Sequence, residues 1–173
     1  ALAGGAAFED ATQDYEDVFG REYAALHTHR SEDAEGVLVQ MGSFATKAQD
    51  AVDRLRDQGI KAGLVRPFLI RPWPGEALRK ALKSKKAVVV IDQNISMGMG
   101  GVLHSEVAGV LYGHANMPPV LMNAIGGLGG RDILFNEYAA LAKEALQAFE
   151  GGKTPPPRLL YTETELREIR KLQ

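Results

Sequence analysis

A chain of 173 residues is long enough for one domain with a complete hydrophobic core, because domains usually contain ~100–200 residues. The absence of cysteine excludes disulfides, thiolate zinc sites, a cysteine nucleophile and a cysteine-bound iron–sulfur cluster within these residues. The net charge of -2 removes the electrostatic basis for non-specific nucleic-acid binding, and no apolar run approaches the ~20 residues that span a bilayer. We therefore expect a cytoplasmic protein that binds neither nucleic acid nor membrane.

Short apolar runs alternate with helical patterns along the chain. In order, the pattern predicts a helix over 8–19, a strand over 23–29, a strand over 36–41, a helix over 44–56, a strand over 60–65, a helix over 76–83, a strand over 87–91, a helix over 102–112, a strand over 120–125, a helix over 138–149 and a helix over 164–172. Ser43 suits the N-cap of the helix over 44–56, and Gly59 suits its left-handed C-terminal cap. The alternation predicts an α/β fold in which helices cover both faces of a parallel sheet.

Glycine departs from average usage, with 19 residues where ~7% of the chain would be about 12. Seven of them lie in two loops, at 98–101 and 126–130, and each loop follows a predicted strand. Parallel α/β sheets bind ligands beyond the carboxyl ends of their strands, so both loops are candidate sites. The candidate residues are Ser96, Gly98, Gly100 and Gly101 in the first loop and Gly126, Gly127, Gly129, Gly130, Arg131 and Asp132 in the second.

Two interpretations of these loops are open. Backbone amides before a helix can bind a phosphate, and Arg131 could clamp a phosphate or carboxylate. The spacing of known nucleotide motifs is absent, however: Leu103 stands where G-x-G-x-x-G needs its third glycine, and no G-x-x-x-x-G-K-[ST] occurs. We favour the second interpretation, in which the loops are tight turns or partner-docking surfaces and Arg131 and Asp132 hold the loop in place.

Arg66, Arg71 and Trp73 form a further candidate group. Each arginine precedes a proline, which favours extended backbone, and Trp73 follows closely in the sequence. An arginine stacked on Trp73 and a subunit contact are both open, since Trp and Arg are common interface anchors.

No set of residues with catalytic spacing is present. His27 and His29 would share one side of a strand, but no third ligand follows at metal-binding spacing, so we expect solvated histidines and no metal site. His104, Ser105 and Glu106 are adjacent on a predicted helix and cannot face one another as a triad. We therefore expect no catalytic residue in this chain.

Four segments occur in a characteristic order: VQMGS at 39–43, VRPFLIRPWP at 65–74, VIDQNIS at 90–96 followed by Gly100, Gly101 and Glu106, and IGGLGGRD at 125–132. Together they resemble the C-terminal domain of the alpha subunit of pyruvate:ferredoxin oxidoreductase (pyruvate synthase) and its 2-oxoacid relatives. A more distant likeness extends to the last domain of transketolase. Those relatives often begin the following helix with Ser/Thr-Pro-Glu, whereas this chain has Leu134-Phe135-Asn136.

The resemblance implies a three-layer α/β/α domain of the transketolase C-terminal type. Its five-stranded sheet would be mostly parallel, with the segment over 23–29 as the one antiparallel strand. This domain would occupy 23–152. Residues 1–22 would be a helix or linker from a preceding domain, and 153–173 a proline-rich arm with a C-terminal helix.

The resemblance also implies a parent enzyme that oxidatively decarboxylates pyruvate with coenzyme A and reduces ferredoxin. Its thiamine diphosphate, magnesium and iron–sulfur clusters are expected in other domains or subunits, because no cofactor-contacting residue of the family maps onto this chain. We expect a non-catalytic assembly domain within an oligomeric complex of beta, gamma and ferredoxin-like delta subunits. The alternatives are a phosphate- or coenzyme A-binding module built on the glycine loops, and the same domain of another thiamine-dependent 2-oxoacid enzyme.

Overall fold

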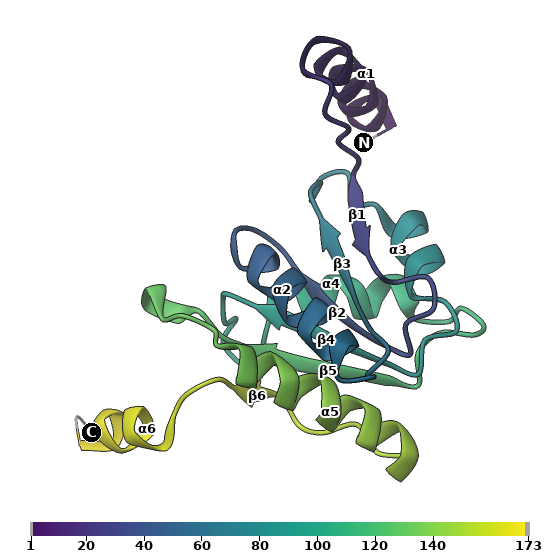
Figure 1. The fold of residues 1–173 in the computed structure, drawn as a ribbon. Helices are drawn as coiled ribbons and strands as arrows, with labels where there is room; N and C mark the ends of the chain where they lie inside the picture. Colours follow the sequence, from purple (N-terminus) through teal and green to yellow (C-terminus); the bar gives the residue numbers. More distant parts are fainter. Residues whose placement is uncertain (1, 172–173) are drawn as a thin grey trace.

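Six strands form one sheet in the order β1-β3-β2-β4-β5-β6 in the computed structural model, which describes residues 2–171 (Figure 1). The elements are α1 (Leu2–Phe19), β1 (Leu26–His29), β2 (Gly36–Gln40), α2 (Phe44–Asp57), β3 (Ala62–Pro67), α3 (Gly75–Leu82), β4 (Ala87–Asp92), α4 (Val102–Leu111), β5 (Val120–Ile125), the 3-10 turn η1 (Leu128–Gly130), α5 (Phe135–Gly151), β6 (Arg158–Leu159) and α6 (Glu163–Lys171). Strands β2 to β6 pair in parallel, and β1 pairs antiparallel with β3. The predicted single antiparallel strand is confirmed.

The expected strand count of five is wrong, because β6 adds a sixth strand at the edge beside β5. It is only two residues long, and Leu160, directly after it, donates its amide to the Ile125 carbonyl at 2.8 Å. A two-residue strand carries no periodicity that a sequence pattern could reveal. The proline-rich arm therefore returns to the sheet, and Leu160 is buried in the core.

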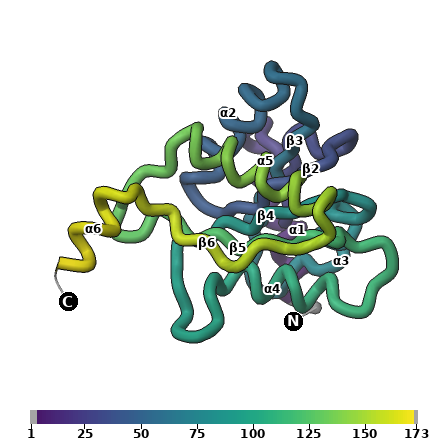
Figure 2. Tube along the Cα trace, turned by 90° about the horizontal axis from the view of Figure 1, so that it is seen from below, coloured from purple at the N-terminus to yellow at the C-terminus, as the bar shows by residue number. Residues whose placement is uncertain are grey.

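Helices cover both faces of the sheet, which confirms the three-layer α/β/α architecture. Side chains alternate along each strand, so Leu38 and Ile91 pack with α2 and α5 on one face, while Val39 and Val90 pack with α3 and α4 on the other. Figure 2 shows the two pairs of helices on opposite sides of the strands. All of Ala87–Asp92 is buried, as expected for a central strand covered on both faces.

The first and last helices lie outside these layers, at opposite ends of the molecule (Figure 1). An aromatic chain connects α1 to the sheet: the Tyr15 ring lies 5.3 Å from that of Tyr23, which in turn lies 5.9 Å from that of Phe68. Helix α6 contains no buried residue. Within residues 2–171, no helix is both long enough and apolar enough to cross a membrane.

The ends of two helices test the predicted caps. Gly59, with a φ of +80°, follows the end of α2 as expected, and its amide donates to the Arg56 carbonyl. Ser43 precedes α2, but its side chain makes no capping hydrogen bond, because the residue itself has helical backbone angles. Helix α5 begins at Phe135, and at its start the Glu137 carboxylate accepts the Leu134 amide at 2.8 Å.

Candidate functional site

The two glycine-rich loops leave adjacent strands at the same edge of the sheet. Strands β4 and β5 are paired up to Asp92 and Ile125, and the Gly126 amide donates to the Asp92 carbonyl at 2.9 Å. The candidate residues at 96–101 and 126–132 therefore begin side by side at the carboxyl ends of these two strands. This is the edge at which α/β sheets usually bind their ligands.

Asp92 organises the first loop. Its buried carboxylate accepts the amides of Leu103 at 2.8 Å and His104 at 3.1 Å, both in the first turn of α4. Asn94 accepts the Val102 amide at 3.1 Å. Burial raises the pKa of Asp92, and the two amide hydrogen bonds partly oppose that shift. The first-turn donors that could hold a bound phosphate are thus already engaged by side chains of the loop itself.

Arg131 holds the second loop against two helices. Its guanidinium donates to Glu137 of α5 at 2.9 Å and to Glu165 of α6 at 2.9 Å, and its side chain is 16% exposed. These two carboxylates raise the pKa of Arg131. A hydrogen bond from the Thr162 amide, together with those from Arg131, lowers the pKa of Glu165 to about 2. The guanidinium is therefore occupied by internal partners.

Asp132 fixes the same loop to α2, through an ion pair with Lys47. The hydrogen bond from Lys47 is the largest cause that lowers the pKa of Asp132. Gly127 has a φ of +78°, and a Cβ there would come within 3.2 Å of the Phe44 ring. The loop thus contacts α2, α5 and α6 at once. The positive φ favours glycine at position 127, and a Cβ there would also crowd the Phe44 ring.

Of the two open interpretations of Arg66, Arg71 and Trp73, the arginine stacked on Trp73 is not found, and the subunit contact stays a prediction. The Arg66 guanidinium lies 4.6 Å from the Phe68 ring centroid and donates to the Gly42 carbonyl at 3.0 Å, while Arg71 pairs with Glu106 at 2.5 Å. Trp73 packs on the opposite face, against the core between the sheet and α3 and α4, and its indole N–H has no hydrogen-bond partner among residues 2–171. Arg66 stacks on Phe68 because residues two apart in an extended chain share a face.

The histidines lie in different surroundings and do not gather into one site. His29 lies 2.9 Å from Asp53 of α2, so the expectation of a solvated side chain is wrong at this position. This hydrogen bond is the largest cause that lowers the pKa of Asp53. Burial lowers the pKa of His104, which stands apart on α4. In the described part of the chain, no three His, Cys, Asp or Glu residues come together as a metal site.

Comparison with known proteins matches the part of the chain that contains this site. The sequence model of a family described as pyruvate:ferredoxin oxidoreductase core domain II matches residues 34–138, which include every strand from β2 to β5 and both glycine loops. The chain belongs to this family.

Curated relatives of this core domain II are larger subunits of oxidoreductases. Pyruvate synthase subunit PorA of Pyrococcus abyssi is 35% identical over 149 residues, which are 86% of this chain and 38% of that subunit. PorA of Thermotoga maritima is 39% identical over 126 residues, 73% of this chain and 32% of that subunit. Ketoisovalerate oxidoreductase subunit VorA of Pyrococcus horikoshii is 36% identical over 142 residues, 82% of this chain and 36% of that subunit. The chain therefore spans well under half the length of these relatives.

Two solved structures share the fold of core domain II. A split-gene transketolase, an inactive beta4 tetramer, matches with a TM-score of 0.57 and 22% identity over 74% of this chain and 45% of that chain. The 2-oxoglutarate:ferredoxin oxidoreductase from Magnetococcus marinus, solved with 2-oxoglutarate, coenzyme A and succinyl-CoA bound, matches with a TM-score of 0.54 and 20% identity over 78% of this chain and 21% of that chain. The expected transketolase-like fold is confirmed.

The residues of core domain II do not fit the cofactors that the resemblance implies. Iron–sulfur clusters need cysteine ligands, and the chain has none. Magnesium with a diphosphate needs converging oxygen ligands, but the buried carboxylate at the ligand-binding edge, Asp92, is already bonded to the amides of α4. That these cofactors lie in other domains or subunits stays a prediction.

Exposed apolar side chains are a feature of the first loop that the glycine pattern missed. Residues 95–102, here termed the methionine loop, expose 92% of Met97 and 66% of Met99 as well as about half of Ile95 and Val102. A bridge between Ser96 and Gly100 closes the turn that projects Met97 and Met99 outward. A pocket of about 330 Å³ beside Met99 reaches Trp73 and Glu106. The glycine content indicated this loop as a candidate site, but the residues that it exposes to solvent are apolar.

Proposed function

We propose that this chain is a non-catalytic assembly domain of a thiamine-diphosphate-dependent 2-oxoacid:ferredoxin oxidoreductase. The parent enzyme would convert pyruvate, coenzyme A and oxidised ferredoxin to acetyl-CoA, carbon dioxide and reduced ferredoxin in the cytoplasm. The proposal is supported by relatives named as pyruvate synthase subunits that align with most of this chain. Its partners would be the other domains and the beta, gamma and ferredoxin-like delta subunits of an oligomeric complex.

One observation carries the assembly role: at the ligand-binding edge the charged groups bond to partners within this chain, and apolar side chains remain exposed. Asp92, Arg131 and Asp132 all have partners within the domain. Met97 and Met99, by contrast, extend into solvent. Exposed apolar side chains gathered in one place are typical of a docking surface, and methionine adapts well to an irregular partner. A neighbouring domain or subunit would therefore cover the methionine loop.

Charge placed on the methionine loop tests this role. In the full assembled enzyme, Met97→Asp with Met99→Asp should shift the complex toward separate subunits, because two buried carboxylates would lack partners at the interface. Analytical ultracentrifugation measures the change. Tyr112→Asp is the matched control, since Tyr112 is 88% exposed and lies at the other end of α4. Unchanged assembly of the methionine variant, or equal disruption by the control, would contradict the proposal.

The alternative of a phosphate- or coenzyme A-binding module predicts that coenzyme A binds at the glycine loops, with a measurable heat of binding when the chain is titrated with it. The geometry offers it little support, because Asp92 and Asn94 already accept the first-turn amides of α4. The alternative of another 2-oxo acid concerns the parent enzyme. Relatives named for pyruvate and for ketoisovalerate match at 35% and 36% identity, so the similarity favours neither substrate.

A further inference from the structure

An open groove lies beside the outermost antiparallel pair of strands, and none of its lining residues belongs to the methionine loop. This β1–β3 groove has a volume of about 680 Å³ and is lined by Arg21, His27, Gln49, Arg66 and Phe68, among others. Its floor consists of the face of β1 and β3 that α2 leaves uncovered at the edge of the sheet. His27 and Arg66 are paired in register across the two strands, so both side chains emerge on this face.

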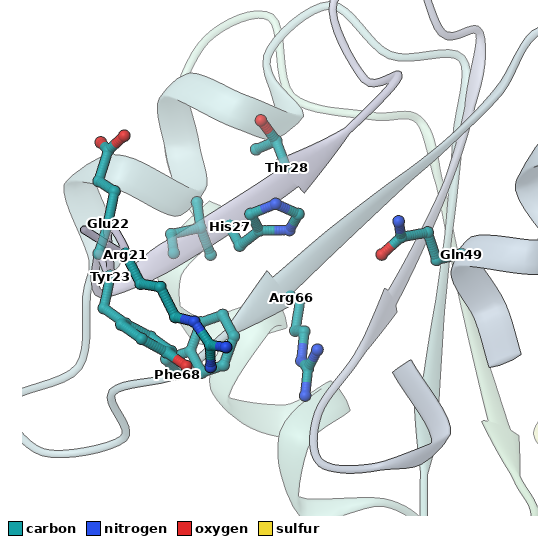
Figure 3. A pocket seen from close by; sticks show the side chains of 10 residues that line it. Arg21, Glu22, Tyr23, His27, Thr28, Gln49, Arg66 and Phe68 are labelled. Carbon is teal, nitrogen blue, oxygen red and sulfur yellow. The ribbon is translucent and has the colours of Figure 1, made fainter. Parts of the chain in front are cut away.

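Positive groups converge in the β1–β3 groove. Figure 3 shows the guanidinium groups of Arg21 and Arg66 on one side, with the His27 ring and the Gln49 amide facing the same space. Glu22 is the one carboxylate among the lining residues, and its side chain points away from Arg66. The four inward-facing groups come from the segment before β1, from β1, from α2 and from β3. These four groups therefore belong to separate segments of the sequence and come together only in the folded chain.

The two arginines of the groove differ from most others in the domain. Arg30, Arg56, Arg71, Arg131 and Arg158 each form an ion pair with a carboxylate. Within residues 2–171, neither Arg21 nor Arg66 has a carboxylate oxygen within 4.0 Å. Arg66 is nevertheless held in place, because it lies over the Phe68 ring and donates to the Gly42 carbonyl. An oriented guanidinium without an anion is prepared to bind one.

We propose that the β1–β3 groove binds the phosphate or diphosphate group of a small molecule. A single carboxylate is satisfied by one bidentate arginine, whereas this groove presents two guanidinium groups, an imidazole and an amide. A phosphate group, with a charge of about -2 and several acceptor oxygens, matches that larger set of donors. The site is separate from the glycine loops and independent of the assembly role.

Isothermal titration calorimetry of the 173-residue chain with pyrophosphate, inorganic phosphate and acetate tests the assignment. We expect saturable binding that is tightest for pyrophosphate, weaker for phosphate and weakest for acetate. Arg21→Gln and Arg66→Gln should each weaken pyrophosphate binding about tenfold, the loss expected for one charge-assisted contact. Tight binding of phosphate alone, with no gain for pyrophosphate, would assign a single phosphate group to the groove.

Arg21→Gln is the decisive variant, because Arg21 is exposed and makes no hydrogen bond within residues 2–171, so its loss leaves the fold intact. Arg167→Gln on α6 is the matched control, since Arg167 is also an exposed arginine without an ion pair in that part of the chain. No saturable binding, equal loss in the control, or acetate binding as tight as that of phosphate would each overturn the proposal.

Discussion

Asp92 shows why the residue at position 101 is glycine. The carboxylate must lie directly against the first turn of α4 to accept the amides of Leu103 and His104. A Cβ at Gly101 would overlap that carboxylate, and one at Gly100 would overlap the Asn123 side chain. These glycines are therefore needed for close packing between the loop and buried polar side chains, and no ligand is required to explain them.

A pair of glycine substitutions on and beside one helix tests this packing. Gly101→Ala should lower the free energy of unfolding by about 2 kcal/mol or more, because overpacking a tight site typically costs about 1–3 kcal/mol. Gly109→Ala should raise it by up to ~1 kcal/mol, since alanine favours helix and its Cβ meets nothing within 4 Å. Urea unfolding followed by circular dichroism measures both. Similar effects of the two substitutions would show that crowding by Asp92 is not the reason for Gly101.

At the scale of elements, α6 depends on one carboxylate. Glu165 bonds to Arg131, to the Thr162 amide and to the Thr162 hydroxyl, while the helix buries no residue of its own. Its pKa of about 2 in the folded chain lies below the ordinary 4.5. A lowered pKa means that the ionised form stabilises the docked helix. This stabilisation is complete above about pH 4.5 and is lost as the pH falls toward 2.

Acid should therefore release α6 before the sheet unfolds. We expect the amide resonances of residues 163–171 to shift toward coil values between about pH 4.5 and 2, while those of β4 persist. Two-dimensional NMR follows both sets. Glu165→Gln should show a released helix already at neutral pH, whereas Glu163→Gln, at a position without an ion pair in residues 2–171, should behave as the natural chain. A pH-independent α6 would contradict the role of Glu165.

At the scale of the whole molecule, the domain joins a three-layer body to two projecting helices, α1 and α6 (Figure 1). Its interior is filled by two apolar cores that occupy the space between the sheet and each helix pair. The internally paired groups Asp92, Arg131 and Asp132 are committed to holding loops in place. A body of this kind can position neighbouring domains without supplying an acid, a base or a nucleophile.

The isolated 173-residue chain should consequently show no pyruvate decarboxylation when thiamine diphosphate, magnesium, coenzyme A and oxidised ferredoxin are supplied. The chain has no cysteine for electron transfer, and its described residues contain no cluster of metal ligands. Carbon dioxide release and ferredoxin absorbance measure turnover, with the complete enzyme as the positive control. Turnover by the isolated chain would refute the non-catalytic assignment.

Much of the architecture could be predicted because it follows from local pattern. Strands β2, β4 and β5 begin at the predicted residues and end within one residue of the predicted ends, since buried runs such as Ala87–Asp92 have few alternatives to a central strand. The candidate site was predicted only in outline. Position at the carboxyl edge follows from strand order, but the partners of Arg131 lie on α5 and α6, up to 34 residues away.

The sequence by itself determined the order of elements, the α/β class, the edge at which the loops gather and the family likeness, because each depends on residues close together in the chain. The tertiary structure alone decided which side chains meet: Asp92 with the amides of α4, Arg131 with Glu165, Arg66 with Phe68, and Arg21 beside Arg66 in an open groove. It also decided the sixth strand. The physical reason is that hydrogen bonds and ion pairs form between groups brought within a few ångströms by packing, whatever their separation along the chain.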